Sequence, residues 1–250
     1  MNQMRCLVLQ VKGKMAHFRN ITSTIRARSY SFPPKTTVAG LLGAIAGVER
    51  YDLPNFARSL LVALKIDVPP RKLIFSINNL KIKTRSLKQL RGSGGHTQQA
   101  TEILLPQVGQ TLQYTCFLMS QKQNLLKMIF ERIKNKNYSF PPSLGPANFP
   151  ATINIVSWGR AEKITLKEPV VMDSVIAEDE IEDIVPIPGC YHREGPMPTQ
   201  LNALRENVGP LRWYYYATDL TQTKILPSKA KVKRAFQVDY CGRQAIISPL

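Results

Sequence analysis

The chain has 250 residues, of which 44% are hydrophobic and 20% are charged, so it can bury a sizeable core and general disorder is excluded. Lysine and arginine number 34 against 17 acidic residues, and the resulting formal charge of +17 favours a polyanionic partner, either nucleic acid or an anionic membrane surface. Composition alone also leaves open an ordinary basic protein.

The first predicted elements are a strand, a loop and a helix. Residues 5–11, RCLVLQV, are apolar and typical of a strand. The loop that follows ends at Pro33 and Pro34, because proline fixes φ and pushes the preceding residue toward extended geometry. Helical periodicity begins near Thr36 and gives the helix two contrasting faces. The apolar face comprises Val38, Leu41, Leu42 and Ile45, and the opposite face Gly40, Gly43 and Gly47.

Further elements follow in an order that indicates the fold class. Residues 60–67 and 71–84 are predicted strands, and residues 85–100 a protruding, glycine-containing loop. Strands over 101–107 and 110–119 precede an amphipathic helix over 121–136. This order predicts an α+β fold, with a ferredoxin-like domain over 1–150 and a smaller β-rich C-terminal region over 151–250.

The common motifs of nucleotide and metal chemistry are missing from the sequence. It contains no P-loop, dinucleotide fingerprint, H-E-x-x-H, C-x-x-C or RNP1 pattern. Its scattered cysteines indicate reduced thiols rather than a disulfide framework or a zinc site, and we expect no cofactor. The longest apolar run, 38–48, is too short to cross a bilayer and no signal peptide precedes it. We therefore expect a cytoplasmic protein with no membrane partner.

The positive charge is concentrated in the first half of the chain. Residues 1–130 carry 19 basic and 4 acidic side chains, whereas residues 131–250 carry 15 and 13. The first acid is Glu49, and no acid lies between Asp67 and Glu102. We therefore assign the polyanion site mostly to the first half. The acidic segment 173–183 is interpreted as a solvated loop, a contact for a basic neighbour, or a repeller of misplaced nucleic acid.

The loop before the first helix combines side chains that suit phosphates. Arg19, Arg26, Arg28 and Tyr30 precede Lys35, Thr36 and Thr37 at the helix start, so guanidinium groups, hydroxyls and unpaired backbone N–H groups occur together. Gly40 and Gly43 would let a ribose-phosphate chain lie close to the helix. The alternative is that the glycine face packs on a neighbouring element of the protein itself.

Catalysis is a further possibility at the sequence level. A metal-independent ribonuclease could use His17, Tyr30 and His96 as general acid and base, since all three lie in the basic half. The favoured interpretation is that these histidines are ordinary polar side chains or RNA contacts, because acid–base geometry cannot be derived from sequence.

Residues 17–47, HFRNITSTIRARSYSFPPKTTVAGLLGAIAG, resemble the N-terminal signature of the fifth CRISPR-associated (Cas) protein family. That signature has an aromatic-Arg pair, here Phe18 and Arg19, a loop ending in Pro-Pro, and a first helix bearing Thr and Gly. Residues 101–119 and 143–153 resemble weaker family segments. The resemblance covers about 150 residues and leaves the last hundred without a diagnostic motif.

The resemblance implies a subunit of the type I Cascade surveillance complex, with a ferredoxin-like fold of the repeat-associated (RAMP) superfamily and a role in antiviral defence. Such a subunit holds the 5′ handle of CRISPR RNA (crRNA), caps the filament of backbone subunits and meets the large subunit and, through the complex, target DNA. A protruding β-hairpin, the thumb, is expected at about 84–110. The expected RNA contacts are His17, Phe18, Arg19, Arg26, Arg28, Tyr30, Lys35, Thr36, Thr37, Arg85, Lys88 and Arg91.

Catalytic residues are not assigned, because no His-Tyr-Lys group aligns with the family members that cut precursor RNA. The resemblance therefore favours a non-catalytic RNA-binding subunit. A metal-independent endoribonuclease that processes precursor crRNA is the alternative. A general or ribosomal RNA-binding protein is a third possibility.

Overall fold

The computed structural model describes residues 3–23, 26–82 and 86–250. The first half of the chain contains, in order, β1 (Gln3–Gly13), β2 (Phe18–Arg19), β3 (Ser29–Tyr30), α1 (Lys35–Ala46), α2 (Leu53–Arg58), β4 (Leu61–Ile66), β5 (Arg71–Leu80), α3 (Leu87–Leu90), β6 (His96–Leu105), β7 (Leu112–Met119) and α4 (Gln123–Lys134). The second half contains β8 (Ala151–Ile164), β9 (Val170–Met172), β10 (Ile176–Ala177), the 3-10 turn η1 (Glu178–Glu180), β11 (Ile181–Val185), β12 (Cys190–Pro198), β13 (Leu211–Thr218), β14 (Ile225–Leu226), β15 (Ser228–Val232), β16 (Ala235–Tyr240) and β17 (Arg243–Ile247).

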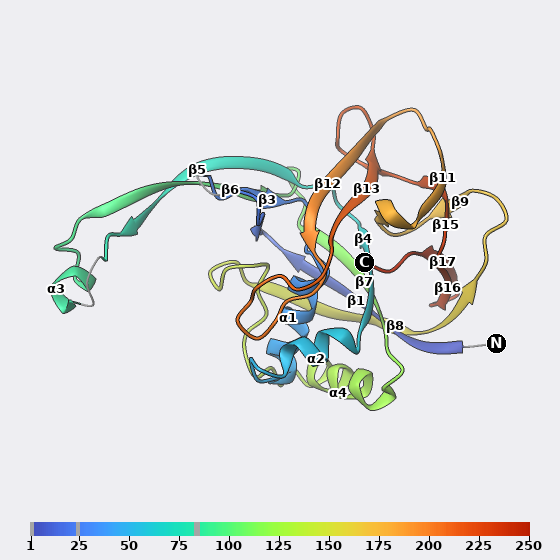
Figure 1. The fold of residues 1–250 in the computed structure, drawn as a ribbon, viewed down its shortest axis with the longest axis horizontal. Helices are drawn as coiled ribbons and strands as arrows, with labels where there is room; N and C mark the ends of the chain where they lie inside the picture. Colours follow the sequence, from blue (N-terminus) through green and yellow to red (C-terminus); the bar gives the residue numbers. More distant parts are fainter. Residues whose placement is uncertain (1–2, 24–25, 83–85) are drawn as a thin grey trace.

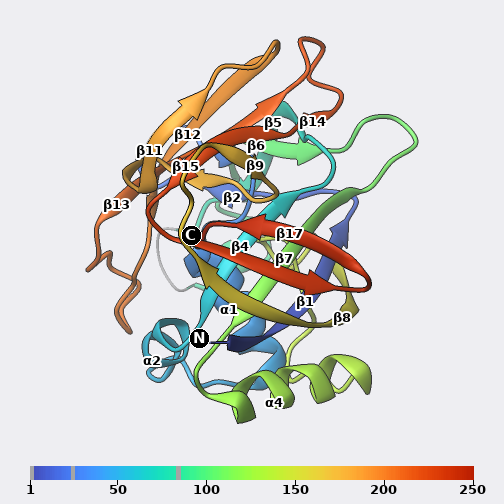
Figure 2. The ribbon, with the colours of Figure 1, turned by 90° about the vertical axis from the view of Figure 1, so that its right-hand side faces the viewer.

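Six strands form a curled main sheet in the order β17–β16–β8–β1–β7–β4, and every neighbouring pair is antiparallel. β1 lies inside this sheet, so its side chains are buried on alternate faces. Leu7 and Leu9 belong to the larger core, which also contains residues of α1 and α4, whereas Cys6 and Val8 belong to a second core on the opposite face. The helices and the sheet β10–β13–β12 share one core, because Tyr214 and Tyr216 of β13 lie in the same cluster as Leu7 and Leu9; Figure 2 shows α2 and α4 at the lower end of the view and the smaller sheets at its upper end.

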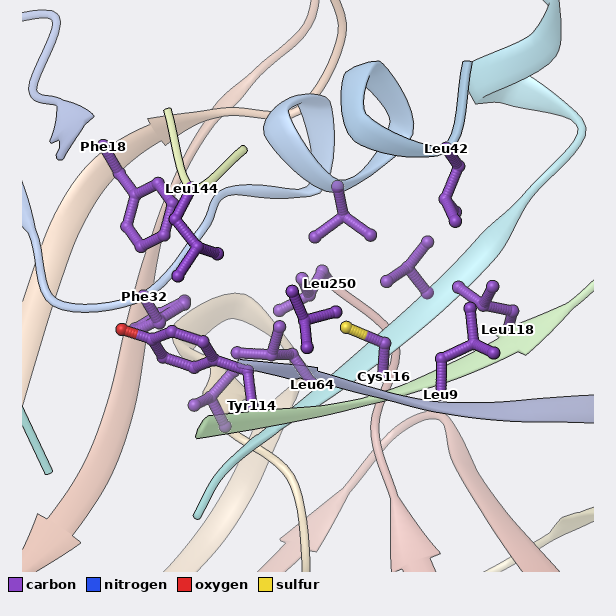
Figure 3. Close-up of a cluster of buried hydrophobic side chains, with 14 of the residues drawn as sticks. Leu9, Phe18, Phe32, Leu42, Leu64, Tyr114, Cys116, Leu118, Leu144 and Leu250 are labelled. Atoms are coloured by element: carbon purple, nitrogen blue, oxygen red, sulfur yellow. The ribbon is translucent and has the colours of Figure 1, made fainter. Parts of the chain in front are cut away.

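The larger core lies between α1 and the sheet. Leu42 of α1 points toward Leu9 and Leu118 of the sheet, and Tyr114 and Phe18 extend the cluster toward the loop between β1 and α1 (Figure 3). The predicted apolar face of α1 is confirmed for Val38, Leu42 and Ile45, which are all buried.

The C-terminal hundred residues are joined to this sheet. β8 pairs with β1 from Ala151 opposite Gly13 to Glu162 opposite Gln3, and β16 continues the sheet beyond β8. At the far edge, the Leu250 N–H donates to the Val62 carbonyl at 2.7 Å. The predicted boundary at residue 150 is therefore corrected, because residue 151 begins a strand of the main sheet. The rest of the region forms two smaller sheets, β10–β13–β12 with β14, and β11–β15–β9.

β5 and β6 form a long hairpin that projects from the body, with α3 at its tip (Figure 1). The register runs from Arg71 opposite Leu105 to Leu80 opposite His96. The protruding hairpin predicted at 84–110 spans residues 71–105, and the predicted loop 85–100 is wrong for 87–90, which form α3, and for 96–100, which lie in β6. The outer half of the hairpin has no buried face, so its sequence lacks the period-two pattern that normally identifies a strand.

Two further elements differ from those predicted. The short helix α2 was not predicted, and the strand predicted to reach residue 84 ends at Leu80, with residues 83–85 outside the described part. All four cysteines are free, and burial raises the pKa of the Cys6 and Cys116 thiols to about 12. Within the described residues, no helix is long and apolar enough to cross a membrane.

Candidate nucleic-acid interface

The cationic loop between β1 and α1 is fastened to the base of the hairpin. Ala16 exchanges two backbone hydrogen bonds with Leu104, at 3.1 and 2.8 Å. Further along, the Ala27 N–H donates to the Ala100 carbonyl at 3.1 Å, and the Glu102 N–H donates to the Ala27 carbonyl at 2.9 Å. Ala27 thus lies beside β6 like a residue of a third strand. The arginines that flank Ala27 are therefore held at the inner end of the hairpin.

Three predicted contact residues anchor this loop instead of facing solvent. Phe18 and Tyr30 are paired across β2 and β3 and are 2% and 0% exposed. The ring of Phe18 packs edge-on against Tyr114, with centroids 6.0 Å apart, and the Tyr30 hydroxyl donates to the Pro196 carbonyl. His17 is also buried, with Nδ1 2.7 Å from the Glu102 carbonyl oxygen. Their side chains are enclosed and position the loop, so their role as direct RNA contacts stays a prediction.

The three arginines of the loop have the opposite character. Arg19, Arg26 and Arg28 are exposed, and none forms an ion pair with any carboxylate of the described residues. An exposed guanidinium without a partner keeps all its N–H donors for an external anion.

A pocket of about 260 Å³ opens beside Arg26 and Arg28. Its wall also includes Lys72 of β5 and Arg193 of β12, so four cationic side chains surround it. Two carboxylates line it as well: Lys72 Nζ lies 3.2 Å from Glu194 and 3.8 Å from Glu102. Segments from four parts of the sequence meet in this pocket.

Arg193 is held in place by three contacts. It forms a two-pronged hydrogen bond with the Glu178 carboxylate at 3.0 and 2.9 Å, and its guanidinium lies over the Trp213 ring, 3.8 Å from the centroid. The Tyr215 hydroxyl donates to the same carboxylate at 3.1 Å. The hydrogen bond from Arg193 holds the pKa of Glu178 below its usual range. Arg193 was not predicted as a site residue, because in the sequence it lies in the second half of the chain, where acidic and basic residues nearly balance.

The start of α1 forms a second cationic group. Lys35, Thr36 and Thr37 are half-buried, and this first turn contains no acidic residue and no side-chain cap. Burial, and then the positive charges of Arg212 and Arg234, lower the pKa of Lys35. The two arginines are paired with the acidic segment, Arg212 with Asp179 at 3.0 Å and Arg234 with Glu180. At least part of segment 173–183 therefore neutralises cations of the protein itself.

The two helix glycines predicted to allow close approach differ. A side chain at Gly43 would meet Leu53 of α2 at 2.6 Å, so this face packs on a neighbouring helix, as the structural alternative expected. A Cβ added at Gly40 would meet nothing within 4 Å, so this position remains open for a close approach.

The hairpin adds both charge and apolar surface. Lys88 and Arg91 lie exposed at its tip, far from the cationic loop (Figure 1), while the predicted contact Arg85 lies outside the described residues. Unusually for a strand, β5 exposes Leu73, Ile74 and Phe75 in succession, at 48%, 54% and 38%.

The candidate acid–base residues are not brought together. His96 pairs with Leu80 at the outer end of the hairpin, whereas His17 and Tyr30 lie buried at its base. The described residues also contain no group of three or more His, Cys, Asp or Glu side chains that could hold a metal ion.

A mixed α/β fold with a cationic loop and a cationic projecting hairpin defines a polyanion-binding class of protein. The family model described as CRISPR-associated protein (Cas_Cas5) matches residues 6–180, and the chain belongs to this family. The resemblance of residues 17–47 is thereby confirmed. No curated protein matches the chain.

Solved structures with the same fold agree with this assignment. A chain of a structure described as a CRISPR RNA-guided surveillance complex is 11% identical, with a TM-score of 0.51, over 90% of this chain and 91% of that chain. A CRISPR protein from Archaeoglobus fulgidus is 13% identical, with a TM-score of 0.51, over 99% and 100% of the two chains. At sequence identities of 11% and 13%, this similarity shows a shared fold and no more. Together with the family, it supports a CRISPR-associated RNA-binding role.

Proposed function

We propose that this protein is a non-catalytic RNA-binding subunit of a type I Cascade complex, in which it holds the 5′ handle of crRNA and caps the backbone filament. The observation that carries the proposal is the unpaired, exposed set Arg19, Arg26 and Arg28 at the base of the hairpin. Together with Lys35, these side chains would bind the phosphates of a single strand.

The fold supports a ferredoxin-like assignment for the part that carries this loop. Four strands of the main sheet lie in the order β8–β1–β7–β4, with α1 between β1 and β4 and α4 between β7 and β8 in the chain. This is the strand–helix–strand–strand–helix–strand order of that fold.

We assign the thumb role to the hairpin β5–β6. An isolated two-stranded ribbon is marginally stable in water, and this one exposes three successive apolar side chains, Leu73, Ile74 and Phe75. Its contact with a neighbouring backbone subunit and with the crRNA would cover that surface. Contacts with the large subunit and with target DNA would then arise through the assembled complex.

Purification of the full chain, co-expressed with its CRISPR array and neighbouring cas genes, tests the assignment. We expect crRNA and backbone subunits to copurify with it, and the Arg19, Arg26 and Arg28 triple alanine variant to lose the RNA. Recovery of the chain alone, or of a complex with unrelated RNA, would contradict the proposal.

Incubation of the pure chain with repeat RNA in EDTA tests the non-catalytic part of the proposal. We expect the RNA to stay intact, and cleavage at one site would identify the endoribonuclease instead.

A further inference from the structure

The pocket beside Arg26 and Arg28 has features that a phosphate site does not need. Glu102 and Glu194 line it with side chains only 13% and 14% exposed, and a carboxylate repels a phosphate. The cations Arg26 and Arg28 lie on the same wall without carboxylate partners. A ligand that suits both groups offers N–H donors to the carboxylates and an anion to the arginines. A nucleotide has both.

The hydrogen-bonding capacity of Glu102 is only partly used. Its Oε1 accepts the Ser29 backbone N–H at 3.0 Å and lies 3.8 Å from Lys72 Nζ, whereas its Oε2 has no partner among the described residues. Glu194 is more fully engaged: Oε1 accepts from Lys72 at 3.2 Å and Oε2 from the Ser31 hydroxyl at 2.6 Å. Glu102 is therefore the free acceptor of the pocket, and Lys72 is a donor next to it.

This pair of groups matches one base better than the others. Guanine presents a carbonyl oxygen and two adjacent N–H donors, N1–H and N2–H, on its Watson–Crick edge. The carboxylate of Glu102 can accept both donors while Lys72 donates to O6. Uracil offers one donor, and cytosine and adenine each offer an amino donor beside a ring nitrogen that accepts. Ala27, Ala100 and Ile74 supply small or apolar walls for a planar ring. The volume of about 260 Å³ is below that of pockets for drug-sized ligands, so the pocket suits a single base rather than a larger ligand.

We propose that this pocket binds a single guanine of the RNA strand through the Glu102 carboxylate, with Lys72 on O6 and with Arg26 and Arg28 on the adjoining phosphates. The inference rests on the proposed RNA-binding function and adds base selectivity to it.

Fluorescence anisotropy of the full chain tests the inference with a labelled oligouridylate, in which single positions are replaced by guanosine, inosine, adenosine or cytidine. We expect one guanosine to tighten binding at least about fivefold, the lower end for a two-pronged base contact. Inosine, which lacks the N2 amino group, should lose most of this gain. Equal affinity for the guanosine, inosine and uridine oligomers would overturn the pocket but leave salt-dependent RNA binding, and hence the proposed function, intact. Failure to bind any oligomer would overturn both.

A variant and its control locate the effect. Glu102→Gln keeps an acceptor for the Ser29 N–H but directs an amide N–H₂ toward the guanine donors, so it should abolish the guanosine preference. Glu131→Gln, an exposed position on α4, should keep the preference. A guanosine preference that persists in Glu102→Gln would overturn the assignment. Guanosine monophosphate as competitor, and the same oligomers made as DNA, show which kind of guanine ligand the pocket prefers. Binding of guanosine monophosphate with no guanosine preference among the oligomers would overturn binding of a strand.

Discussion

The arginines at the pocket are of two kinds, which differ in how firmly they are held. Arg193 is fixed between Glu178 and Trp213, whereas Arg26 and Arg28 have no ionic partner among the described residues. A fixed guanidinium is already oriented, but its charge is shared with a carboxylate. We therefore expect Arg26 and Arg28 to supply most of the ionic affinity, and Arg193 to shape the wall.

The first prediction concerns Arg19, Arg26 and Arg28. Because they are exposed and unpaired, alanine at each should change the unfolding free energy by no more than about 0.5 kcal/mol. Loss of a charge-assisted contact should weaken binding of handle RNA by about 1 to 3 kcal/mol, and lysine should restore it incompletely. Thermal melting and RNA affinity are measured on the same variants. Arg243→Ala, at an exposed strand start away from the hairpin, is the control, and lower melting with unchanged RNA affinity would show that the loop arginines are structural.

The second prediction concerns Asp67, whose carboxyl is partly buried and accepts from the Thr115 hydroxyl at 2.8 Å. Burial raises its pKa above the ordinary value of 3.8, so the folded state favours the protonated form. The stabilisation that protonated Asp67 gives the folded state is fully present below the pKa of the unfolded state, and it is lost as the pH rises through the raised pKa of the folded state. Asp67→Asn, which keeps the acceptor, should therefore melt at a higher temperature than the wild type at neutral pH, and this gain should shrink as pH falls toward 4. A gain independent of pH would contradict the assigned cause. The exposed Asp239→Asn is the control.

At the scale of elements, local pattern was informative wherever an element buries one face. The helix predicted over 121–136 is confirmed as α4, which buries Leu126, Ile129 and Ile133, and the Pro33–Pro34 pair places the start of α1 within a residue of its position. The outer part of β6 was not predicted, because residues 96–100 have no buried face to impose a pattern. Two loops that contact each other, at residues 17 and 145, give no sequence signal of that contact.

That contact yields the third prediction. Gly145 has a φ of +100°, and a Cβ there would lie 2.0 Å from the His17 carbonyl oxygen. Gly145→Ala should therefore cost more than about 2 kcal/mol, since backbone strain and a clash with fixed backbone add together. Gly109→Ala isolates the strain, because φ is +79° with open space around it, and should cost about 1 to 2 kcal/mol. Chemical denaturation measures both losses, and equal losses would show that the His17 loop moves aside without cost.

The fourth prediction concerns the hairpin. Leu80 lies opposite His96, so residues 81–95 can be replaced by an Asn-Gly turn that keeps the register. The described residues removed supply no buried side chain, and we expect melting within the change of a surface substitution, about 0.5 kcal/mol. Incorporation into a guide-bound complex should be lost, as judged by copurification. The double variant Lys88→Gln and Arg91→Gln keeps the full length of the hairpin, so it shows whether assembly needs the charge at the tip or the length of the hairpin. Normal assembly of the shortened chain would contradict the thumb assignment.

At the scale of the whole molecule, the sequence located the charge but not the pocket. The excess of the first 130 residues does face outward at Arg19, Arg26 and Arg28. The pocket, however, needs Lys72, Glu102 and Arg193 beside them, and only the meeting of the hairpin base with β12 brings these together. Glu102 ends the acid-free stretch in sequence, yet in space it lines the same pocket as Arg26 and Arg28, and its Oε2 has no partner among the described residues. No pattern in the sequence indicates that these pocket residues lie close together.

The last prediction follows from the unpaired cations of that half. If about five or six phosphates are neutralised, the logarithm of the RNA association constant should fall with the logarithm of salt concentration at a slope of about −4, taking about −0.7 per phosphate of a single strand. The Arg19, Arg26 and Arg28 triple alanine variant should reduce the slope by about 2, because it removes three of those contacts. Arg243→Ala should keep the wild-type slope. Titrations of a handle-length RNA at several salt concentrations give the three slopes. A wild-type slope near zero would place binding elsewhere than in ionic contacts, and an unchanged slope in the triple variant would move the ionic contacts away from the loop, to the start of α1 or to the hairpin tip.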